Sequence, residues 1–398
     1  MNGTRSIILI LVAVLTSAPS VAGDWDITGF AGIESQAYLQ DGRYPGQDDE
    51  YNLSLLLQPE FYWRSDDGRR RFSFVGFARA DLQDRKRSHA DIREAYWGFE
   101  GDDWDLNAGI GKVFWGVTES RHLVDVINQS DLVEDIDQED KLGQPMVNFN
   151  LQRDYGRFEL YVLPWFRERT FPGPDGRFRP ALPIDDDNPI YESSASQNHV
   201  DLAFRYSHYV GDLDVGIHLF EGTSREPRFV ISSEGDSLSP VYDQMTQIGV
   251  DLQYTRDAWL WKLETIVRDT RVDSFLAAVG GFEYTFYGIH DSSADIGVLL
   301  EFLYDGRNDA SPPTAFDNDL FVGARFALND ASDTSVLAGF AIDTDTDEIF
   351  LNLEAERRFG DNVSVELRLR AFANSHSGEA LYAFERDDYL QLRISKYY

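Results

Sequence analysis

The sequence of 398 residues contains no cysteine. This absence excludes disulfide-stapled folds, thiolate zinc centres, iron–sulfur clusters, cysteine nucleophiles and a lipoprotein anchor. Basic residues are also scarce, with 36 Lys and Arg against 69 Asp and Glu and a formal net charge of −33. Because nucleic-acid binding needs clustered basic side chains that neutralise phosphates, we expect no nucleic-acid partner.

The sequence also lacks an apolar run long enough to cross a bilayer as a helix, which needs about twenty residues. The apolar run at the start, Ile7 to Leu15, is preceded by Arg5 and followed by the small residues Ser20-Val21-Ala22. This arrangement is typical of a secretory signal peptide, and a retained helical anchor is the alternative. We expect residues 1–22 to be cleaved after export and residues 23–398 to form the mature protein.

Most of the remaining chain alternates apolar and polar residues. Ile248, Val250, Leu252 and Tyr254 share one face of a strand pattern, and the segment from Val363 to Arg370 alternates in the same way. Period-two alternation is the pattern of half-buried strands, and no helical periodicity of useful length is present. The aromatic content of 14% is spread evenly, which argues against disorder. The sequence therefore predicts an all-β protein.

The links between these strand patterns fall into two classes that largely alternate along the chain. Bacterial outer-membrane barrels join their strands by short periplasmic turns and longer external loops, whereas a sandwich or propeller has no reason to alternate in this way. We predict a transmembrane antiparallel β-barrel of about eighteen strands, with sixteen as the fallback. The count is least certain around Leu82–His89 and Val272–Asp295. The short links are Ser65–Arg69, Gly101–Asp103, Asp154–Gly156, Gly211, Arg256–Asp257, Asn329–Asp333 and Gly360–Asn362, and the long links are Gln40–Glu50, Leu82–His89, Trp115–Pro145, Arg167–Asn198, Gly222–Tyr242, Asp305–Asn318 and Asn374–Asp387.

Charged residues recur on the polar faces of the predicted strands. A packed soluble core would have to bury them, whereas a water-filled lumen hydrates them cheaply. This assignment depends on strand parity, and a register error of one residue would invert a whole strand. The predicted lumen charges are Arg205, Lys262, Glu264, Arg325, Glu354, Glu366, Arg368, Arg370 and Arg393.

Aromatic residues near the predicted strand ends suit the interfacial girdles of a membrane barrel. The last strand, Asp388–Tyr398, alternates and ends on an aromatic residue, and it is similar to the C-terminal assembly signal of outer-membrane barrels. We expect outer-membrane lipid, lipopolysaccharide and the barrel-assembly machinery as partners, and an oligomer is compatible with the sequence. The girdle candidates are Tyr62, Trp63, Trp97, Phe99, Trp104, Trp259, Trp261, Tyr389 and Tyr398.

One segment resembles a known group of proteins. Arg93-Glu-Ala-Tyr96 is followed by Gly111-Lys-Val-Phe-Trp-Gly116 and by Asp125-Val-Ile-Asn-Gln-Ser-Asp131. This order is similar to that of porin-like proteobacterial outer-membrane proteins whose function is not known. The chain departs from their pattern at Lys112-Val113 and at Gln129, where proline is common. The resemblance covers roughly residues 90–135 and implies an outer-membrane barrel, but it implies no substrate and no binding residue.

The long link Trp115–Pro145 follows the fifth predicted strand and is rich in acidic residues. If it is the third external loop, its resemblance to the third loop of many porins implies that it folds into the lumen and narrows it. An acidic constriction would favour cations. The alternative is a solvated loop outside the barrel. The candidate constriction residues are Glu119, Arg121, Asp125, Asp131, Glu134 and Asp135.

Motifs for catalysis and cofactor binding are weak. No two of the seven histidines show the spacing of a zinc site, and His122 is notable only because it lies in the long acidic link. No Gly-x-Ser-x-Gly elbow and no phosphate-binding loop occur. We expect no metal, no cofactor and no enzymatic activity. The sequence predicts a porin-like channel for passive diffusion of small hydrophilic solutes with a preference for cations. The alternatives are a non-conducting structural or adhesive barrel and a secreted carbohydrate-binding β-protein.

Overall fold

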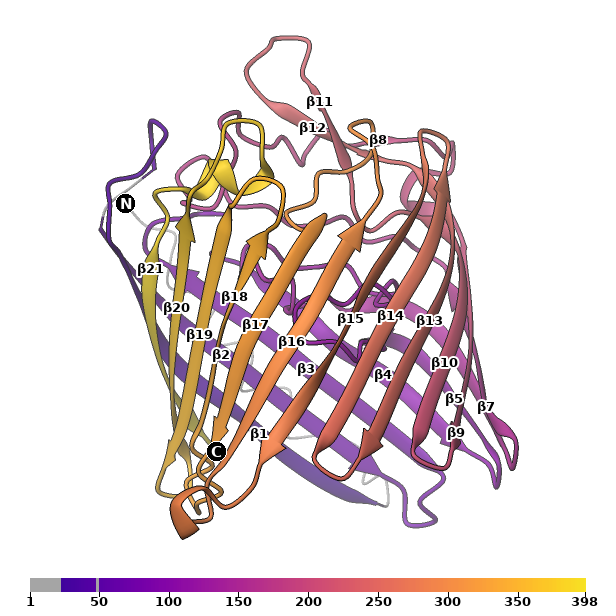
Figure 1. The fold of residues 1–398 in the computed structure, drawn as a ribbon. Helices are drawn as coiled ribbons and strands as arrows, with labels where there is room; N and C mark the ends of the chain where they lie inside the picture. The colour runs from indigo at the N-terminus through magenta and orange to yellow at the C-terminus, as the bar shows by residue number, and fades with distance from the viewer. Residues whose placement is uncertain (1–22, 48–49) are drawn as a thin grey trace, which may run out of the picture.

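A computed structural model describes residues 23–47 and 50–398, and within them the chain forms a closed barrel of eighteen antiparallel strands (Figure 1). Each barrel strand pairs with its neighbours in chain order, and β21 pairs with β1 to close the barrel. The predicted fold class is confirmed, with eighteen strands rather than sixteen. The predicted signal peptide falls on residues 1–22, which lie outside the described residues.

The barrel strands are mostly eight to fifteen residues long. They are β1 (Asp24–Tyr38), β2 (Tyr51–Arg64), β3 (Arg70–Asp81), β4 (Ala90–Glu100), β5 (Trp104–Gly111), β6 (Gln144–Arg153), β7 (Gly156–Leu163), β9 (Asp201–Val210), β10 (Leu213–Thr223), β13 (Gln244–Arg256), β14 (Trp259–Thr270), β15 (Ser274–Phe286), β16 (Asp295–Asp305), β17 (Asn318–Ala327), β18 (Ser335–Asp343), β19 (Ile349–Phe359), β20 (Val363–Ala373) and β21 (Tyr389–Tyr397).

The two ends of the barrel differ in the length of their connections. The seven links predicted as short lie at one end, called the turn end, and the seven predicted as long lie at the other, called the loop end. The region around 272–295 resolves into a tight turn between β14 and β15 at the loop end and a longer connection between β15 and β16 at the turn end. The latter contains the short helix η3 (Ile289–Asp291).

The loops at the loop end carry secondary structure that the sequence did not predict. A small sheet of β8 (Ile190–Tyr191), β11 (Arg228–Ile231) and β12 (Leu238–Tyr242) stands above the barrel rim (Figure 1). The short helix η2 (Ser196–Asn198) follows β8 in the same loop, and η4 (Ala380–Phe384) lies in the loop between β20 and β21. None of the helices in the described residues is long and apolar enough to cross a membrane.

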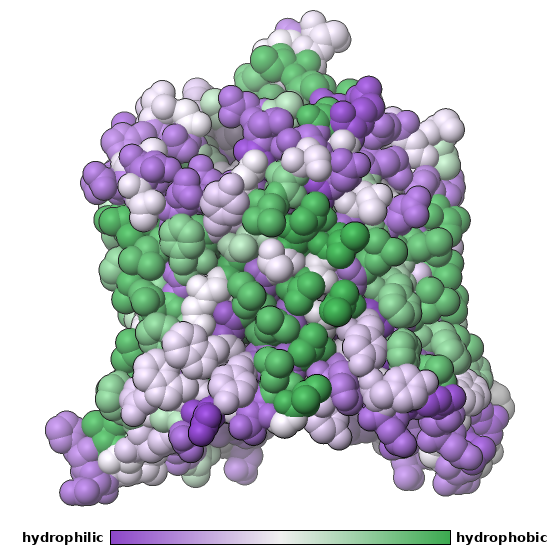
Figure 2. Space-filling view, turned by 45° about the vertical axis from the view of Figure 1, so that its right-hand side comes forward, coloured by the Kyte–Doolittle hydropathy of each residue, from purple (hydrophilic) through white to green (hydrophobic). Residues whose placement is uncertain are grey.

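The outer face of the barrel is apolar around its middle. In β2, Leu53, Leu55 and Leu57 point outward, and the side chain of Leu55 is 56% exposed, while Ser54 and Leu56 between them are buried. Figure 2 shows the resulting band of hydrophobic residues between two polar rims. A soluble protein rarely exposes an apolar surface of this size. The band is the lipid-facing surface expected of a barrel whose strands cross a membrane.

Aromatic residues near the turn end form part of the predicted girdle. The rings of Trp63 and Trp97 are 5.6 Å apart, and Trp259 stacks on Trp261 at 5.5 Å. The prediction was wrong for Tyr389. This side chain is 2% exposed and faces the interior, because the parity of β21 places it on the same face as Arg393.

Close strand packing leaves no room for a side chain at Gly281 in the barrel wall. A Cβ atom on Gly281 in β15 would lie 1.9 Å from the carbonyl oxygen of Leu300 in β16, whereas a Cβ atom on Gly111 would meet only the sulfur and methyl of Met146 at ordinary contact distance. We expect Gly281→Ala to cost about 1–3 kcal/mol of stability, as overpacking does, and Gly111→Ala to have little effect. The temperature at which each variant unfolds can be read from its heat-dependent change of mobility on gels. Equal unfolding temperatures for the two variants would contradict the packing argument.

Candidate functional site

The connection between β5 and β6, residues 112–143, folds into the barrel and is called the lumen loop. Its apolar side chains Val124, Ile127 and Leu142 are at most 2% exposed. Several of them form one hydrophobic cluster with inward-facing wall residues such as Phe220 of β10 and Ile266 of β14. A loop outside the barrel could not bury these residues, so the alternative of a purely external solvated loop does not hold for this segment.

Two carboxylates of the wall fix the first half of the lumen loop. Glu264 in β14 is fully buried and accepts hydrogen bonds from the backbone N–H groups of Val117 (2.7 Å), Thr118 (3.0 Å) and Val124 (3.1 Å). Glu301 in β16 accepts in the same way from the backbone of residues 119 and 120, each at 2.8 Å. Charge-assisted bonds to backbone N–H groups are short and strong. They replace the backbone partners that a loop otherwise finds in water.

Arginines on the opposite wall hold the second half of the lumen loop. Each of them binds a carboxylate of the loop, and the wall strands involved are β3, β4 and β20. The pairs are Arg79–Glu134 (2.5 Å), Arg93–Asp131 (2.6 Å) and Arg368–Asp135 (2.7 Å). Because the two halves of the loop are anchored to different walls, the loop spans the lumen.

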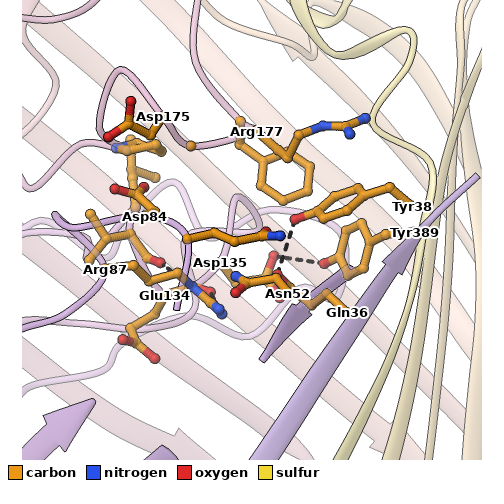
Figure 3. A pocket seen from close by; sticks show the side chains of 16 residues that line it. Gln36, Tyr38, Asn52, Asp84, Arg87, Glu134, Asp135, Asp175, Arg177 and Tyr389 are labelled. Atoms are coloured by element: carbon orange, nitrogen blue, oxygen red, sulfur yellow. Dashed lines mark hydrogen bonds between the residues drawn. The ribbon is translucent and has the colours of Figure 1, made fainter. Parts of the chain in front are cut away.

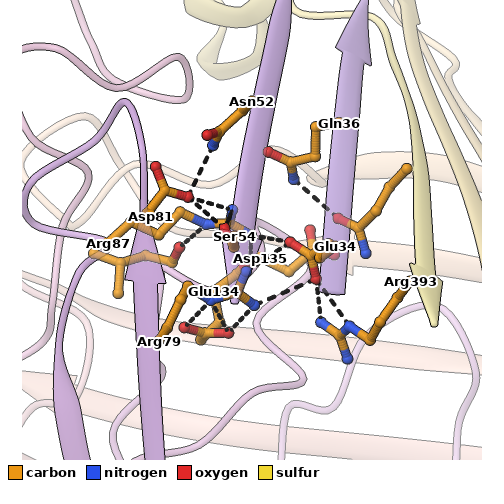
Figure 4. Close-up of polar contacts among 12 residues, drawn as sticks. Glu34, Gln36, Asn52, Ser54, Arg79, Asp81, Arg87, Glu134, Asp135 and Arg393 are labelled. Atoms are coloured by element: carbon orange, nitrogen blue, oxygen red, sulfur yellow. Dashed lines mark hydrogen bonds and ion pairs between the residues drawn. The ribbon is translucent and has the colours of Figure 1, made fainter. Parts of the chain in front are cut away.

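Glu34 in β1 is the centre of this anchoring (Figure 4). Its side chain is completely buried, and its carboxylate binds Arg79 at 2.7 Å, Arg87 at 2.7 Å and Arg393 at 2.6 Å. Arg87 also donates from Nε to the backbone carbonyl of Val133 in the lumen loop, at 2.9 Å. Three guanidinium groups therefore share one carboxylate and connect it to the loop.

Sequence reasoning missed this centre, although part of its signal was present. Glu34 and Arg79 each interrupt the small and apolar residues of a strand pattern on the inner face, as the predicted lumen charges do. Arg87 lies in a link between two strands, where parity carries no information. Its position could be known only from the folded loop.

The predicted constriction residues at the start of the loop face basic and acidic wall groups. The carboxylate of Glu119 binds Arg325 at 2.7 Å and lies 3.6 Å from the Nζ of Lys262. Arg121 pairs with Asp305 at 3.0 Å. Glu119 therefore links the loop to β17 and adds a second contact with β14, beside that made by Glu264.

Asp125 behaves differently from the other five predicted residues of the lumen loop. Its side chain is 1% exposed, and its basic neighbours are Lys141, at 3.4 Å from Oδ2, and His122, both of the same loop. Burial raises the pKa of Asp125 above its usual value. Asp125 therefore braces the loop internally and does not contact the barrel wall.

The nine predicted lumen charges all lie on inner faces of their strands. Arg205 forms two hydrogen bonds to Asp251 at 2.7 and 2.8 Å. Arg370 binds Glu354 at 2.7 Å. Glu366 lies 3.6 Å from Arg393. The contacts of the other predicted lumen charges with the lumen loop and with Glu34 are those given above. Arg268 of β14 belongs to the same face but was not among the nine candidates.

The interior is not filled evenly. The Arg325 side chain on β17 is 41% exposed and that of Glu354 on β19 is 36% exposed, although both strand faces point inward. Glu34 on the opposite wall has no exposed side-chain surface. Water therefore reaches the inner wall along β17 to β19, beside the lumen loop.

A second long segment, residues 164–189 between β7 and β8, lies across the loop end and is called the mouth loop. Arg177 in it binds Asp387 at 2.7 Å and the carbonyl oxygen of Gln40 at 3.0 Å, so it reaches the loops next to β1 and β21. Thr170 donates a hydrogen bond to Asp131 of the lumen loop at 2.6 Å. The mouth loop thus covers part of the barrel opening above the lumen loop.

A small polar cavity of about 30 Å³ lies between the two loops and the wall (Figure 3). Three aromatic rings border it: Tyr389 lies 5.9 Å from Tyr38 and 5.3 Å from Phe178. The guanidinium of Arg177 stands over the Tyr38 ring at 4.2 Å. The Oδ1 atom of Asn52 is buried here with no hydrogen-bond partner in the described residues. A polar cavity of this size holds about two water molecules, which would satisfy groups such as the Asn52 amide oxygen.

One trio of side chains has the composition of a metal site. His89, Asp131 and Glu134 place ligand atoms within 4.8 Å of one another. Each carboxylate already binds an arginine, Arg93 or Arg79. The guanidinium groups neutralise the trio, so its composition is explained by the anchoring of the lumen loop.

We expect Glu34→Gln to destabilise the barrel by about 3–5 kcal/mol, because it leaves three buried guanidinium groups without their shared carboxylate. Asp102→Asn removes a carboxylate that is 91% exposed and pairs with Arg69, and it serves as the matched control with no measurable change. Urea-dependent unfolding in detergent gives both values. A wild-type midpoint for Glu34→Gln would show that Glu34 does not anchor the loop.

His122 of the lumen loop makes stability depend on alkaline pH. Burial opposes its charged form, but Glu139 at 3.0 Å and Glu264 at 3.8 Å raise the pKa of His122 to about 10. Because the folded pKa lies above the unfolded value of about 6.5, this stabilisation is complete below pH 6.5 and is lost as the pH rises toward 10. Relative to His122→Gln, the wild type should lose about 1.4 kcal/mol per pH unit in that window. Parallel pH profiles for the two proteins would exclude a charged His122.

No protein-family model matches the sequence, and no curated protein sequence matches it. Solved structures do match its fold. Wzi of Escherichia coli, an outer-membrane protein involved in group 1 capsule assembly and described as a carbohydrate-binding β-barrel, aligns with a TM-score of 0.54 and 10% identity over 94% of this chain and 84% of its own. A BenF-like porin from Pseudomonas fluorescens aligns with a TM-score of 0.54 and 10% identity over 94% and 98% of the two chains.

OprB of Pseudomonas putida aligns with a lower TM-score of 0.46, at 10% identity over 94% of each chain. At these identities the likeness concerns the fold alone. The chain has the fold of porin-like outer-membrane β-barrels.

Proposed function

We propose that this protein is an outer-membrane channel through which small hydrophilic solutes diffuse passively. One observation carries the proposal: the lumen loop is fixed across the barrel, yet the inner wall beside it is exposed at Arg325 (41%) and Glu354 (36%). A barrel closed by its own side chains would bury both groups. A charged, hydrated wall next to a rigid loop is the arrangement of a narrow water-filled passage.

The location follows from the outer surface. The apolar band in Figure 2 needs lipid around it, and only closed barrels and helices satisfy all backbone groups in a membrane. We infer that residues 1–22 direct export and that outer-membrane lipid and lipopolysaccharide surround the barrel. The final strand β21, which closes the barrel against β1, would be the segment presented to the assembly machinery.

The lumen loop would set the narrowest part of the passage. Glu119 of the loop faces Arg325 and Lys262, and Asp137 of the loop faces Arg370. Opposite charges across a narrow lumen create a transverse field that orients dipolar solutes and disfavours apolar ones. Four carboxylates, Glu119, Asp137, Glu283 and Glu354, lie beside three basic groups, Arg325, Lys262 and Arg370, so we propose a modest preference for cations.

A second candidate function is a non-conducting barrel that binds a saccharide at its loop end. Two observations favour it: the mouth loop crosses the opening, and three aromatic rings and amide groups meet beneath it around the cavity of Figure 3. The cavity of about 30 Å³ would have to widen by movement of the mouth loop to admit a sugar ring. Aromatic faces together with hydrogen-bonding side chains recognise sugar rings. Wzi, whose fold is similar, is described as carbohydrate-binding.

Conductance of the purified protein in a planar bilayer with a salt gradient tests the proposal. We expect discrete current steps and a reversal potential that favours cations. Arg325→Gln should increase the cation preference and Glu354→Gln should decrease it, because each removes one charge from the wall of the passage. Arg357→Gln is the matched control for Arg325→Gln. It removes the same positive charge from a side chain of similar exposure (42%), but on the outer face of β19, and it should leave selectivity unchanged.

Shifts of the same sign for Arg325→Gln and Glu354→Gln would show that these residues do not line the passage. Insertion without current steps would contradict the channel and favour the second candidate. Anion preference of the wild type would keep the channel and overturn the acidic constriction.

A further inference from the structure

Several arginines gather at the loop end of the lumen, in a chain whose net charge is −33. They come from different elements: Arg121 from the lumen loop, Arg169 from the mouth loop, Arg268 from the end of β14, and Arg307 from the loop after β16. None of these elements is adjacent in sequence to another. The folded barrel alone brings them together, and the anchoring of the lumen loop by Glu34 does not involve them.

Shared carboxylates link three of the four arginine side chains to one another. A single oxygen of Glu226, Oε2, accepts from Arg268 and from Arg307, each at 2.9 Å. Asp305 binds Arg307 at 2.7 Å and Arg121 at 3.0 Å through its Oδ2 atom. The side chains of Arg268 and Arg307 are 8% and 4% exposed, so this chain of ion pairs is largely removed from bulk water.

Arg169 completes the group. Its Nε donates to Gln129 of the lumen loop at 3.1 Å, and its charge interacts with that of Glu226 without a hydrogen bond between them. Burial lowers the pKa of Arg169, and burial together with Arg307 lowers the pKa of Arg121. Both directions mean that positive charge is incompletely compensated at this place.

The charges of the cluster do not balance. Among the ion pairs of the described residues, Arg121, Arg268 and Arg307 share two carboxylates, Glu226 and Asp305, and Arg169 has none. Asp273 and Asp319 act on Arg307 and Arg121 only beyond ion-pair distance. Partly buried positive charge without a close counter-charge is unfavourable. Donors also remain: among the hydrogen bonds of the described residues, none uses the two terminal nitrogens of Arg169 or the NH2 groups of Arg121 and Arg268. Guanidinium forks with free N–H groups match the geometry of carboxylate and phosphate oxygens.

We propose that Arg121, Arg169 and Arg268 form an oxyanion-binding site that receives a carboxylate or phosphate group of the transported solute. The site lies on the loop-end side of Glu264, four residues further along β14, and therefore before the passage between the lumen loop and β17 to β19. A solute would be held here by its anionic group before it reaches the constriction. The site names a class of solute for the proposed channel. Binding of an oxyanion at the site is independent of the channel function, and only the transport of the bound solute rests on it.

Binding to the full-length mature barrel in detergent tests the site without requiring current. Titration calorimetry with inorganic phosphate and with glucuronate provides the two oxyanion probes, and glucose is the neutral control. We expect at least one oxyanion to bind at least tenfold more tightly than glucose, and the stronger of the two identifies the preferred group. Arg169→Gln should weaken that binding about tenfold, because it removes two free donors and a charge. Arg85→Gln, which alters a side chain that is 87% exposed, is the matched control with unchanged affinity.

A second variant guards against loss of folding as an explanation. Glu226→Gln removes a compensating carboxylate, so it should strengthen oxyanion binding severalfold, a result that misfolding cannot produce. Equal affinities of wild type and both variants, or no binding of either oxyanion, would overturn the site. Oxyanion binding by a barrel that shows no current in bilayers would support the site and contradict the channel. Current without oxyanion binding would support the channel and contradict the site.

Discussion

The interior of this barrel depends on buried ion pairs between its wall and a loop that crosses it. Glu34 is the central group, because its carboxylate binds three guanidinium groups, which come from β3, β21 and the link between β3 and β4. The remaining positive charge is met by Glu134, Asp81 and Glu366. In a low-dielectric interior such a network is strong when every member has a partner and costly when one is missing. The loop is therefore a fixed part of the barrel wall and defines the space left inside it.

The shape of the remaining space follows from where those pairs are made. The loop is bound through Glu264 and Glu301 on one wall and through Arg79 and Arg93 on the other. The strands β17 to β19 contribute fewer anchors, and their inward-facing charges keep contact with water. A passage on one side of the lumen is the direct consequence of this asymmetric anchoring.

The chain as a whole is acidic, but one part of its lumen is basic. The chain carries an excess of acids, and the wall of the passage reflects it. At the loop end, however, Arg121, Arg268 and Arg307 share Glu226 and Asp305, and Arg169 beside them has no ion pair in the described part of the chain. Small ions respond to the field of the narrowest region, whereas a bound solute responds to the hydrogen-bond donors that it meets first. Net charge alone therefore does not determine what such a barrel recognises.

The sequence by itself determined the strands, the two ends of the barrel and the inner faces, because period-two alternation and turn chemistry are local properties. It located Arg325 and Glu354 on the inner faces of their strands for that reason. Only the tertiary structure decided that Glu34 binds Arg87, that Tyr389 meets Tyr38 and Phe178, and that arginines from four separate segments meet. Closure of the barrel and the path of its loops bring these groups together, and contacts across a lumen leave no periodic trace in the chain.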